Sequence, residues 1–349
     1  MNLTRREALA LGAGVVLAGG LRAAEPKKRL GVVIHSYGIH RANPPKGDGP
    51  RFDDPCDFLD HCATLGAAGV QTALGVRGAE YTERLRAKAE KHGMYVEGTV
   101  ALPKNDDDVK RFADELRTAK ECGATVVRTV AMNGRRYETF ETKGAFDEFA
   151  KQAWKSLQLA EPVARELGVK LAVENHKDWR IDELLGVLKK LDSAHVGVCL
   201  DTGNSIALLE EPLEVVKAYA PWTFTTHFKD MAVAEYDDGF LLSEVPLGDG
   251  FLDLKQVLAV VEKARPGVRW NLEMITRDPL RVPCLAPKYW ATMDAVGGRQ
   301  LAQALAMVRK HKAAAPLPVV GKLTLAERLD AEEANIRKCF KYARDSMGW

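Results

Sequence analysis

The chain has 349 residues, of which 46% are hydrophobic, so it is long enough for one large domain with a substantial core. Its 50 basic and 48 acidic residues nearly balance, which argues against electrostatic binding to nucleic acid. Beyond residue 24, no apolar run is long enough to span a bilayer. The six cysteines form no CxxC pair, so we expect mostly isolated buried thiols, with a disulfide involving Cys284 left open.

The first 24 residues are typical of an export signal. Arg5 and Arg6 precede an uncharged Ala/Gly/Val/Leu stretch that is too short and too rich in glycine for a stable transmembrane helix. This arrangement resembles a twin-arginine translocation signal, which exports proteins that have already folded. It predicts a periplasmic protein, or a membrane-anchored one if the signal is not cleaved.

After this segment, short apolar runs alternate with amphipathic stretches. The apolar runs predict eight strands, which begin at Leu30, Gly69, Tyr95, Val126, Lys170, Val196, Phe224 and Arg269. The amphipathic stretches predict helices at 54–65, 80–92, 106–122, 145–167, 180–191, 212–219, 253–264 and 290–311. This order predicts a (β/α)8 TIM barrel over residues 28–311. A doubly wound sheet is the alternative, but it would not bring four consecutive strand ends around one point.

Three loops that follow predicted strands are long, namely 40–53, 231–252 and 276–289. In a barrel these loops lie on the face that carries the strand ends, so we expect them to form a wall around the substrate. Asp230 and Asp249, at and within the second loop region, are expected to fix loop conformations.

The segment 312–349 is predicted to be an extension of the barrel. An Ala/Pro-rich linker leads to a helix that Thr324 is placed to cap and that reaches about Ser346. We expect this helix to pack on the barrel or on a second copy of the chain.

Four consecutive predicted strands end in a metal-type ligand: Glu174, Asp201, His227 and Glu273. In a barrel these residues would converge at one end, where three carboxylates would repel one another and lose hydration. A divalent cation would resolve both problems. Three oxygen ligands and one nitrogen ligand fit a single Mn²⁺, Mg²⁺, Co²⁺ or Zn²⁺ ion.

The residues around these ligands resemble a known family. The segments Val173-Glu174-Asn175-His176, Leu200-Asp201-Thr202-Gly203-Asn204, His227-Phe228-Lys229-Asp230, Pro246-Leu247-Gly248-Asp249-Gly250 and Leu272-Glu273 are similar to the sugar phosphate isomerase/epimerase family. These are xylose isomerase-like TIM barrels that include tagatose and psicose 3-epimerases. The resemblance covers residues 30–311. It implies that the four ligands hold one metal ion and that Glu174 and Glu273 also form the acid/base pair.

The implied activity is isomerisation or epimerisation of a small carbohydrate. Two carboxylates on opposite faces of a substrate can remove a proton next to a carbonyl and return it elsewhere. The reaction passes through an enediolate, whose charge a divalent ion stabilises. Return of the proton to the opposite face gives epimerisation, and transfer to the adjacent carbon gives isomerisation.

Five residues near the predicted ligands are candidates for substrate contacts: His35, Arg128, His176, Asn204 and Lys229. Strand alternation points His176 to the same side as Glu174, although a structural hydrogen bond is the alternative. Arg128 is equally suited to an internal salt bridge, and Lys229 to a solvated position. Asn204 stands where related epimerases often carry a histidine, so the substrate contacts implied by the family differ here.

Three other functions are open. A lyase or hydrolase of oxidised, 3-keto glycosides would use the same enediolate, and export disfavours phosphorylated sugars. An apurinic-site endonuclease shares the barrel, but it needs extra histidines, and strands two and three offer Ala73-Leu74 and Thr99-Val100 instead. A non-catalytic sugar-binding barrel would have no need of two opposed glutamates.

Overall fold

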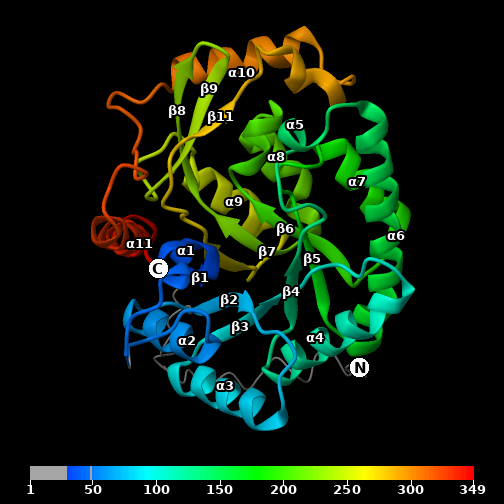
Figure 1. The fold of residues 1–349 in the computed structure, drawn as a ribbon, viewed down its shortest axis with the longest axis vertical. Coiled ribbons are helices and arrows are strands. Elements are labelled where there is room, and N and C mark those ends of the chain that lie inside the picture. Colours follow the sequence, from blue (N-terminus) through cyan, green and yellow to red (C-terminus); the bar gives the residue numbers. More distant parts are fainter. Residues whose placement is uncertain (1–29, 48) are drawn as a thin grey trace, which may run out of the picture.

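A closed barrel of eight parallel strands forms the centre of the protein (Figure 1). The structure is a computed structural model, and it describes residues 30–47 and 49–349, so the predicted export signal at 1–24 lies outside the described residues. The barrel order is β1-β10-β7-β6-β5-β4-β3-β2. The strands are β1 (Leu30–Val33), β2 (Gly69–Ala73), β3 (Tyr95–Thr99), β4 (Val126–Thr129), β5 (Lys170–Glu174), β6 (Val196–Asp201), β7 (Thr223–Phe228) and β10 (Arg269–Leu272). The predicted TIM barrel is confirmed, and every strand starts within one residue of its predicted position.

Helices alternate with these strands and cover the outside of the barrel (Figure 1). The longer ones are α2 (Pro55–Thr64), α3 (Ala79–His92), α4 (Val109–Glu121), α6 (Lys143–Leu167), α7 (Ile181–Leu191), α8 (Pro212–Tyr219) and α9 (Leu254–Ala264). Short helical turns are η1 (Ile34–Tyr37), α1 (Gly38–Ala42), η2 (Asp106–Asp108), α5 (Arg136–Thr139), η3 (Asn204–Leu208), η4 (Ala220–Trp222) and η5 (Pro287–Thr292). Local sequence sets the ends, as in α6, where the Thr142 side chain accepts from the Ala145 N–H and Gly168 ends the helix at a φ of 67°.

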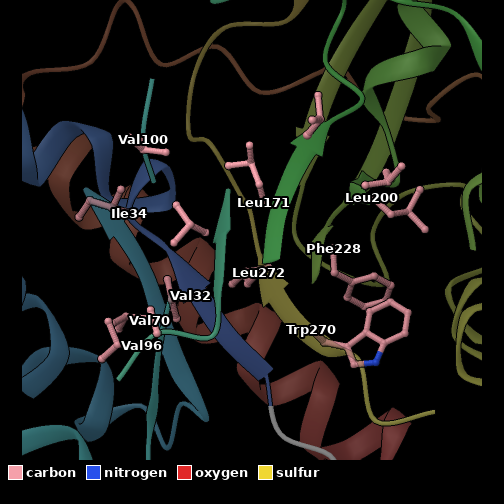
Figure 2. Close-up of a cluster of buried hydrophobic side chains, with 14 of the residues drawn as sticks. Val32, Ile34, Val70, Val96, Val100, Leu171, Leu200, Phe228, Trp270 and Leu272 are labelled. Carbon is pink, nitrogen blue, oxygen red and sulfur yellow. The ribbon is translucent and has the colours of Figure 1, made fainter. Parts of the chain in front are cut away.

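Alternation along each strand separates an apolar outer layer from an interior that contains polar side chains beside a small apolar cluster of Val126, Ala172 and Cys199. Leu171, Trp270 and Leu272 belong to the core between strands and helices (Figure 2). The interior instead contains Glu97 of β3, which is fully buried. Glu97 accepts hydrogen bonds from Gln71, Thr225 and Asn271 at 3.0, 2.8 and 3.2 Å. These hydrogen bonds form a polar layer inside the barrel. Thr225 and Asn271 lie two residues before the predicted ligands His227 and Glu273, so this layer lies next to the ligands along the barrel.

Two of the three long loops form a second, antiparallel sheet. Its strands are β8 (Asp230–Tyr236), β9 (Gly239–Val245) and β11 (Leu280–Val282), in the order β11-β9-β8. Helix α10 (Gly298–Lys310) lies over this sheet (Figure 1), and its Ala304 and Val308 join a separate apolar cluster with Phe240. The single helix predicted at 290–311 is wrong, because the chain leaves the helical conformation between η5 and α10.

The C-terminal helix α11 (Leu325–Met347) begins at the predicted cap. Thr324 accepts from the Glu327 N–H at 3.3 Å, and the Glu327 carboxylate accepts from the Thr324 N–H at 2.8 Å. The helix packs on the barrel beside β1 and α1 (Figure 1). Three of its residues belong to the barrel core, namely Ile336, Cys339 and Ala343.

Trp349 extends this packing to the outside of β7 and β10. Its ring lies 5.8 Å from that of Phe228 and 5.9 Å from that of Trp270. Helix α11 thus takes the place that a (β/α)8 barrel gives to the helix after its last strand. Helix α10, which comes earlier in the chain, covers the small sheet instead.

Two simpler expectations are also met. Across residues 30–47 and 49–349, no helix combines the length and apolar character needed to cross a bilayer. All six cysteines are buried and free, so the disulfide left open for Cys284 does not form.

Candidate metal centre and active site

The four predicted ligands come together at the C-terminal ends of neighbouring strands. Glu174 ends β5, Asp201 ends β6, His227 lies in β7, and Glu273 directly follows β10. The register aligns Asp201 with His227 across β6 and β7. All four side chains are buried, and each offers one ligand atom within 4.8 Å of the others. Among the described residues, this is the one group of its kind.

His227 shows that this cluster fits a metal ion. Its Nε2 lies 2.7 Å from the Gln71 side-chain oxygen, which can only accept a hydrogen bond, so Nε2 carries the proton. Its Nδ1 is buried without a hydrogen-bond partner in the described part of the chain. That atom faces the carboxylates, 3.3 Å from Glu273 and 3.5 Å from Glu174. In the neutral imidazole, a proton on Nε2 leaves the lone pair of Nδ1 directed at three carboxylates, which suits one divalent metal ion. Burial lowers the pKa of His227, but the neighbouring acidic groups, Glu273 and Glu174 among them, raise it further, so the metal-free site holds this pKa well above its usual range.

Two basic residues stabilise the buried carboxylates. Arg128 of β4 donates from Nε to the Glu174 carboxylate at 2.7 Å, so it forms the internal salt bridge left open by the sequence. Lys229 lies 2.9 Å from an Asp201 oxygen and 2.5 Å from a Glu273 oxygen. Lys229 is buried, so the solvated alternative is wrong. Without these cations the acids would be costly to bury.

A cavity of about 280 Å³ opens in front of the ligands. Both Glu174 and Glu273 line it. So do all five predicted substrate contacts, which are His35, Arg128, His176, Asn204 and Lys229. The structure therefore brings the predicted acid/base pair and the predicted contacts to one site.

Three of these residues contact or flank the glutamates. His35 Nδ1 lies 3.1 Å from a Glu273 oxygen, and Asn204 donates to Glu174 at 3.0 Å. The His176 Nδ1 atom is buried and has no hydrogen-bond partner among the described residues. Burial lowers the pKa of His176 to about 3, so the imidazole is neutral at neutral pH.

The wall of the cavity differs from the predicted one. Of the three long loops, only 276–289 supplies lining residues, Arg277 and Leu280, within the described part of the chain. The loop after β4 lines the cavity instead, through residues 133–135. The loop 231–252 acts indirectly, because Glu244 of β9 pairs with Arg277 at 2.7 Å.

Asp230 and Asp249 fix loops as predicted. Asp230 accepts from the backbone N–H groups of Gly248, Gly250 and Leu252 at 2.9, 3.0 and 3.2 Å. Asp249 forms an ion pair with Lys338 of α11. Together they hold the segment between β9 and α9 in place.

Sequence reasoning missed several residues of the site, namely Gln71, Arg135, Lys177, Glu244 and Arg277. Gln71 left a usable signal, since it is a polar residue inside the apolar run of β2. The contacts of Glu244 and Arg277 depend on the β8–β9 hairpin, which the sequence did not predict. Lys177 lies one residue beyond His176, and only the folded loop turns it into the cavity.

Comparison with known proteins agrees with this geometry. A family model described as xylose isomerase-like TIM barrel matches residues 59–310. The chain belongs to the xylose isomerase-like TIM barrel family. All four predicted ligands lie within the matched range.

Curated relatives of this xylose isomerase-like barrel differ in their reactions. A 3-oxo-isoapionate decarboxylase of Pectobacterium atrosepticum is 30% identical, over 55% of this chain and 64% of the relative. An inosose dehydratase of Lacticaseibacillus casei is 26% identical, over 46% of this chain and 60% of the relative. The chain therefore spans less than two thirds of these relatives, and they do not fix one reaction.

Solved structures share the xylose isomerase-like fold. A barrel protein of this type from Mycobacterium smegmatis, in complex with magnesium, has a TM-score of 0.53 at 16% identity, covering 80% of this chain and 98% of that one. A D-psicose 3-epimerase solved with D-fructose has a TM-score of 0.57 at 13% identity, covering 92% of this chain and 100% of that one. At these identities the likeness concerns the fold alone.

Proposed function

We propose that the protein is a divalent-metal-dependent enzyme that isomerises or epimerises a sugar by moving a proton next to a carbonyl. One observation carries this proposal: Glu174 and Glu273 belong to the buried ligand cluster and also line the cavity in front of it. A divalent ion held by Glu174, Asp201, His227 and Glu273 would supply charge stabilisation for an enediolate.

The surrounding residues fix both glutamates. Arg128 and Asn204 bind the two different oxygens of Glu174. His35 and Lys229 bind the two different oxygens of Glu273. Both oxygens of each glutamate are therefore held in place. This suits a reaction in which one glutamate removes a proton from a substrate carbon and the other returns a proton.

A second reaction on the same cavity is a lyase reaction. The relatives named above include a decarboxylase and a dehydratase, and both names describe loss of a group from the substrate. Cleavage of a 3-keto glycoside belongs to the same class, because removal of a proton next to the keto group allows the neighbouring substituent to leave.

Solvent deuterium uptake tests the proposal. Protein loaded with Mg²⁺ or Mn²⁺ is incubated in D₂O with free ketoses and aldoses, and the sugars are analysed by NMR. We expect deuterium at the carbon next to the carbonyl, and Glu174→Gln and Glu273→Gln should each slow the exchange by about 10²- to 10⁴-fold. Release of a leaving group without isomerisation would favour the lyase. Full turnover by both variants would refute the acid/base assignment.

We also propose that residues 1–24 direct export by the twin-arginine pathway into the periplasm. The support is the Arg5-Arg6 pair before an uncharged stretch. A reporter fused after residue 24 should leave the cytoplasm, and Arg5→Lys with Arg6→Lys should retain it there. A reporter that stays in the cytoplasm with both arginines intact would refute the proposal.

A further inference from the structure

The cavity in front of the ligands is lined by an excess of basic side chains. Five of them line it, namely Arg128, Arg135, Lys177, Lys229 and Arg277, against the two carboxylates of Glu174 and Glu273. A divalent ion among the ligands would offset most of the acidic charge, so the basic excess would then increase.

Four of the five basic residues have acidic partners. Arg128 and Lys229 pair with the ligand carboxylates. Arg277 pairs with Glu244 at 2.7 Å, and Arg135 with Glu138 at 3.0 Å. These pairs explain why the fold tolerates the four cations.

Lys177 is different. It is only 4% exposed, and its Nζ donates to the neutral side-chain oxygen of Asn204. In the described part of the chain, no carboxylate lies within ion-pair distance of this amine. Burial, together with the nearby positive charges of Lys229 and Arg277, lowers the pKa of Lys177 to about 8. The folded protein thus carries a buried cation without an ion-pair partner among the described residues, and Asp201 and Glu244 attract it only from a longer distance.

The backbone holds Lys177 firmly beside a second basic residue. Residues 135 and 177 form a parallel β-bridge, and the Arg136 N–H donates to the Lys177 carbonyl at 2.8 Å. The loops after β4 and β5 are therefore joined at the point where Arg135 and Lys177 line the cavity. Arg135 is half-buried and uses its Nε for Glu138, so it remains available at the rim.

We propose that the substrate carries an anionic group, a carboxylate or a phosphate, which binds to Lys177 with Arg135 beside it. This inference rests on the proposed function and defines its substrate class as an anionic sugar rather than a neutral one. The proposed export disfavours phosphorylated sugars, so a sugar acid is the expected member of this class, and a sugar phosphate is the alternative that the binding test separates from it. The anion supplies the negative charge that Lys177 lacks, while the carbonyl end of the substrate faces Glu174 and Glu273.

Binding of matched pairs of probes tests this inference. Calorimetry on Mg²⁺-loaded protein compares D-glucuronate with D-glucose, D-fructose 6-phosphate with D-fructose, and inorganic phosphate as a minimal anion. At least one anionic probe should bind about 10- to 100-fold more tightly than its neutral partner, as one charged hydrogen bond provides. The uronate and phosphate arms decide which anionic group the site takes.

Variants separate anion binding from a merely structural role. Lys177→Met should remove the preference, so that each anionic probe binds about as tightly as its neutral partner. Lys177→Arg should retain most of the preference, and Lys263→Met on the outer helix α9 should have no effect. If Lys177 served only to position Asn204, Lys177→Met would weaken neutral and anionic probes alike.

Three results would overturn the inference: equal binding of both members of every pair, anion binding that survives Lys177→Met, or no binding of any anion. The proposed function fails separately. Deuterium uptake into neutral sugars with no anion preference would refute only the substrate class. Anion binding that depends on Lys177, without deuterium uptake into any sugar, would refute only the reaction.

Discussion

Lys177 and Lys229 are two buried lysines in one cavity, and their surroundings are opposite. Lys229 lies between carboxylates of Asp201 and Glu273, which raise its pKa against the opposing effect of burial. Lys177 donates to the amide of Asn204, and its pKa falls to about 8 because burial outweighs the attraction of more distant acids. Lys229 therefore stabilises the folded state, whereas the buried charge of Lys177 destabilises it.

Lys177→Met should make the metal-free protein more stable at pH 7. The lowered pKa corresponds to about 3 kcal/mol of destabilisation by the buried charge, which the variant removes. The variant also loses the hydrogen bond to Asn204, which costs about 1 kcal/mol. We therefore expect a gain of about 2 kcal/mol in the free energy of unfolding, measured with urea.

The pH dependence of the free energy of unfolding provides a second test of this prediction. Between about pH 8 and 10, the unfolded chain holds the Lys177 proton and the folded chain releases it, so wild-type stability rises relative to the variant. Lys229→Met is the matched comparison and should lose about 3 kcal/mol, since it leaves buried carboxylates unpaired. A loss of stability in Lys177→Met at pH 7 would contradict the account.

Gln71 should control metal affinity through His227. Its side-chain oxygen accepts a hydrogen bond from the Nε2–H group and so directs Nδ1 toward the metal site. Gln71→Leu should weaken Mg²⁺ or Zn²⁺ binding by about 10- to 100-fold in a chelator competition assay. Without its hydrogen-bond partner, the His227 ring is no longer held in the orientation and tautomer that present Nδ1 to the metal. Gln256→Leu, on the exposed face of α9, should leave affinity unchanged. Unchanged affinity in Gln71→Leu would show that the ring is oriented by packing alone.

The sequence predicts ligands better than their partners. Glu174, Asp201, His227 and Glu273 each stand at the end of an apolar run, and strand alternation alone directs them into the barrel. The partner of Lys177 could not be predicted in this way. It depends on Asn204, which approaches from another strand end, and on how the loop after β5 turns.

Helix α11 holds in place the segment of η1 and α1, which carries His35. Glu332 of α11 is buried and accepts from the backbone N–H of Ile39 at 2.8 Å and of His40 at 2.9 Å. The His40 ring adds a third contact at 2.7 Å. The same segment places His35 against Glu273, so the helix at the C-terminal end supports the site from outside.

Glu332→Ala should destabilise the protein by about 2–4 kcal/mol, because the buried N–H of Ile39, the partly buried N–H of His40 and the His40 ring nitrogen would lose their acceptor. Thermal or urea unfolding measures this loss. Asp345→Ala changes an exposed carboxylate on the same helix and should stay within about 0.5 kcal/mol of wild type. A loss in Glu332→Ala no larger than that of the control would mean that solvent replaces the carboxylate.

Elements were predictable where local sequence decides them. The barrel strands and the Thr324 cap follow from apolar runs and capping chemistry. The sequence predicts a loop where the hairpin β8–β9 forms, although a local turn at 237–238 sets the pairing of its two strands. Its third strand, β11, joins β9 from about 40 residues away in the chain, which local sequence does not indicate. The exchange of places between α10 and α11 likewise depends on tertiary packing, which local periodicity does not contain.

For the whole molecule, bound metal should add to stability. A ligand that binds only the folded state contributes about 2.7 kcal/mol at 100 times its Kd. Adding Mg²⁺, Mn²⁺ or Zn²⁺ should therefore raise the unfolding midpoint, and chelation should lower it. Elemental analysis should find about one ion per chain, and the Asp201→Ala/His227→Ala variant should lose both the ion and the shift. A metal-independent midpoint would count against the site.

The closure of the barrel also bears on how fast the chain can fold. Strand β1 pairs with β10, and Glu332 reaches Ile39 across 293 residues of sequence. Contacts between such distant segments raise the contact order, and the entropy of bringing the ends together must be overcome before they contribute. We expect β1 and β10 to meet late, so a partly folded chain exposes two open strand edges. Those edges make aggregation the main competitor of folding until the ring is complete.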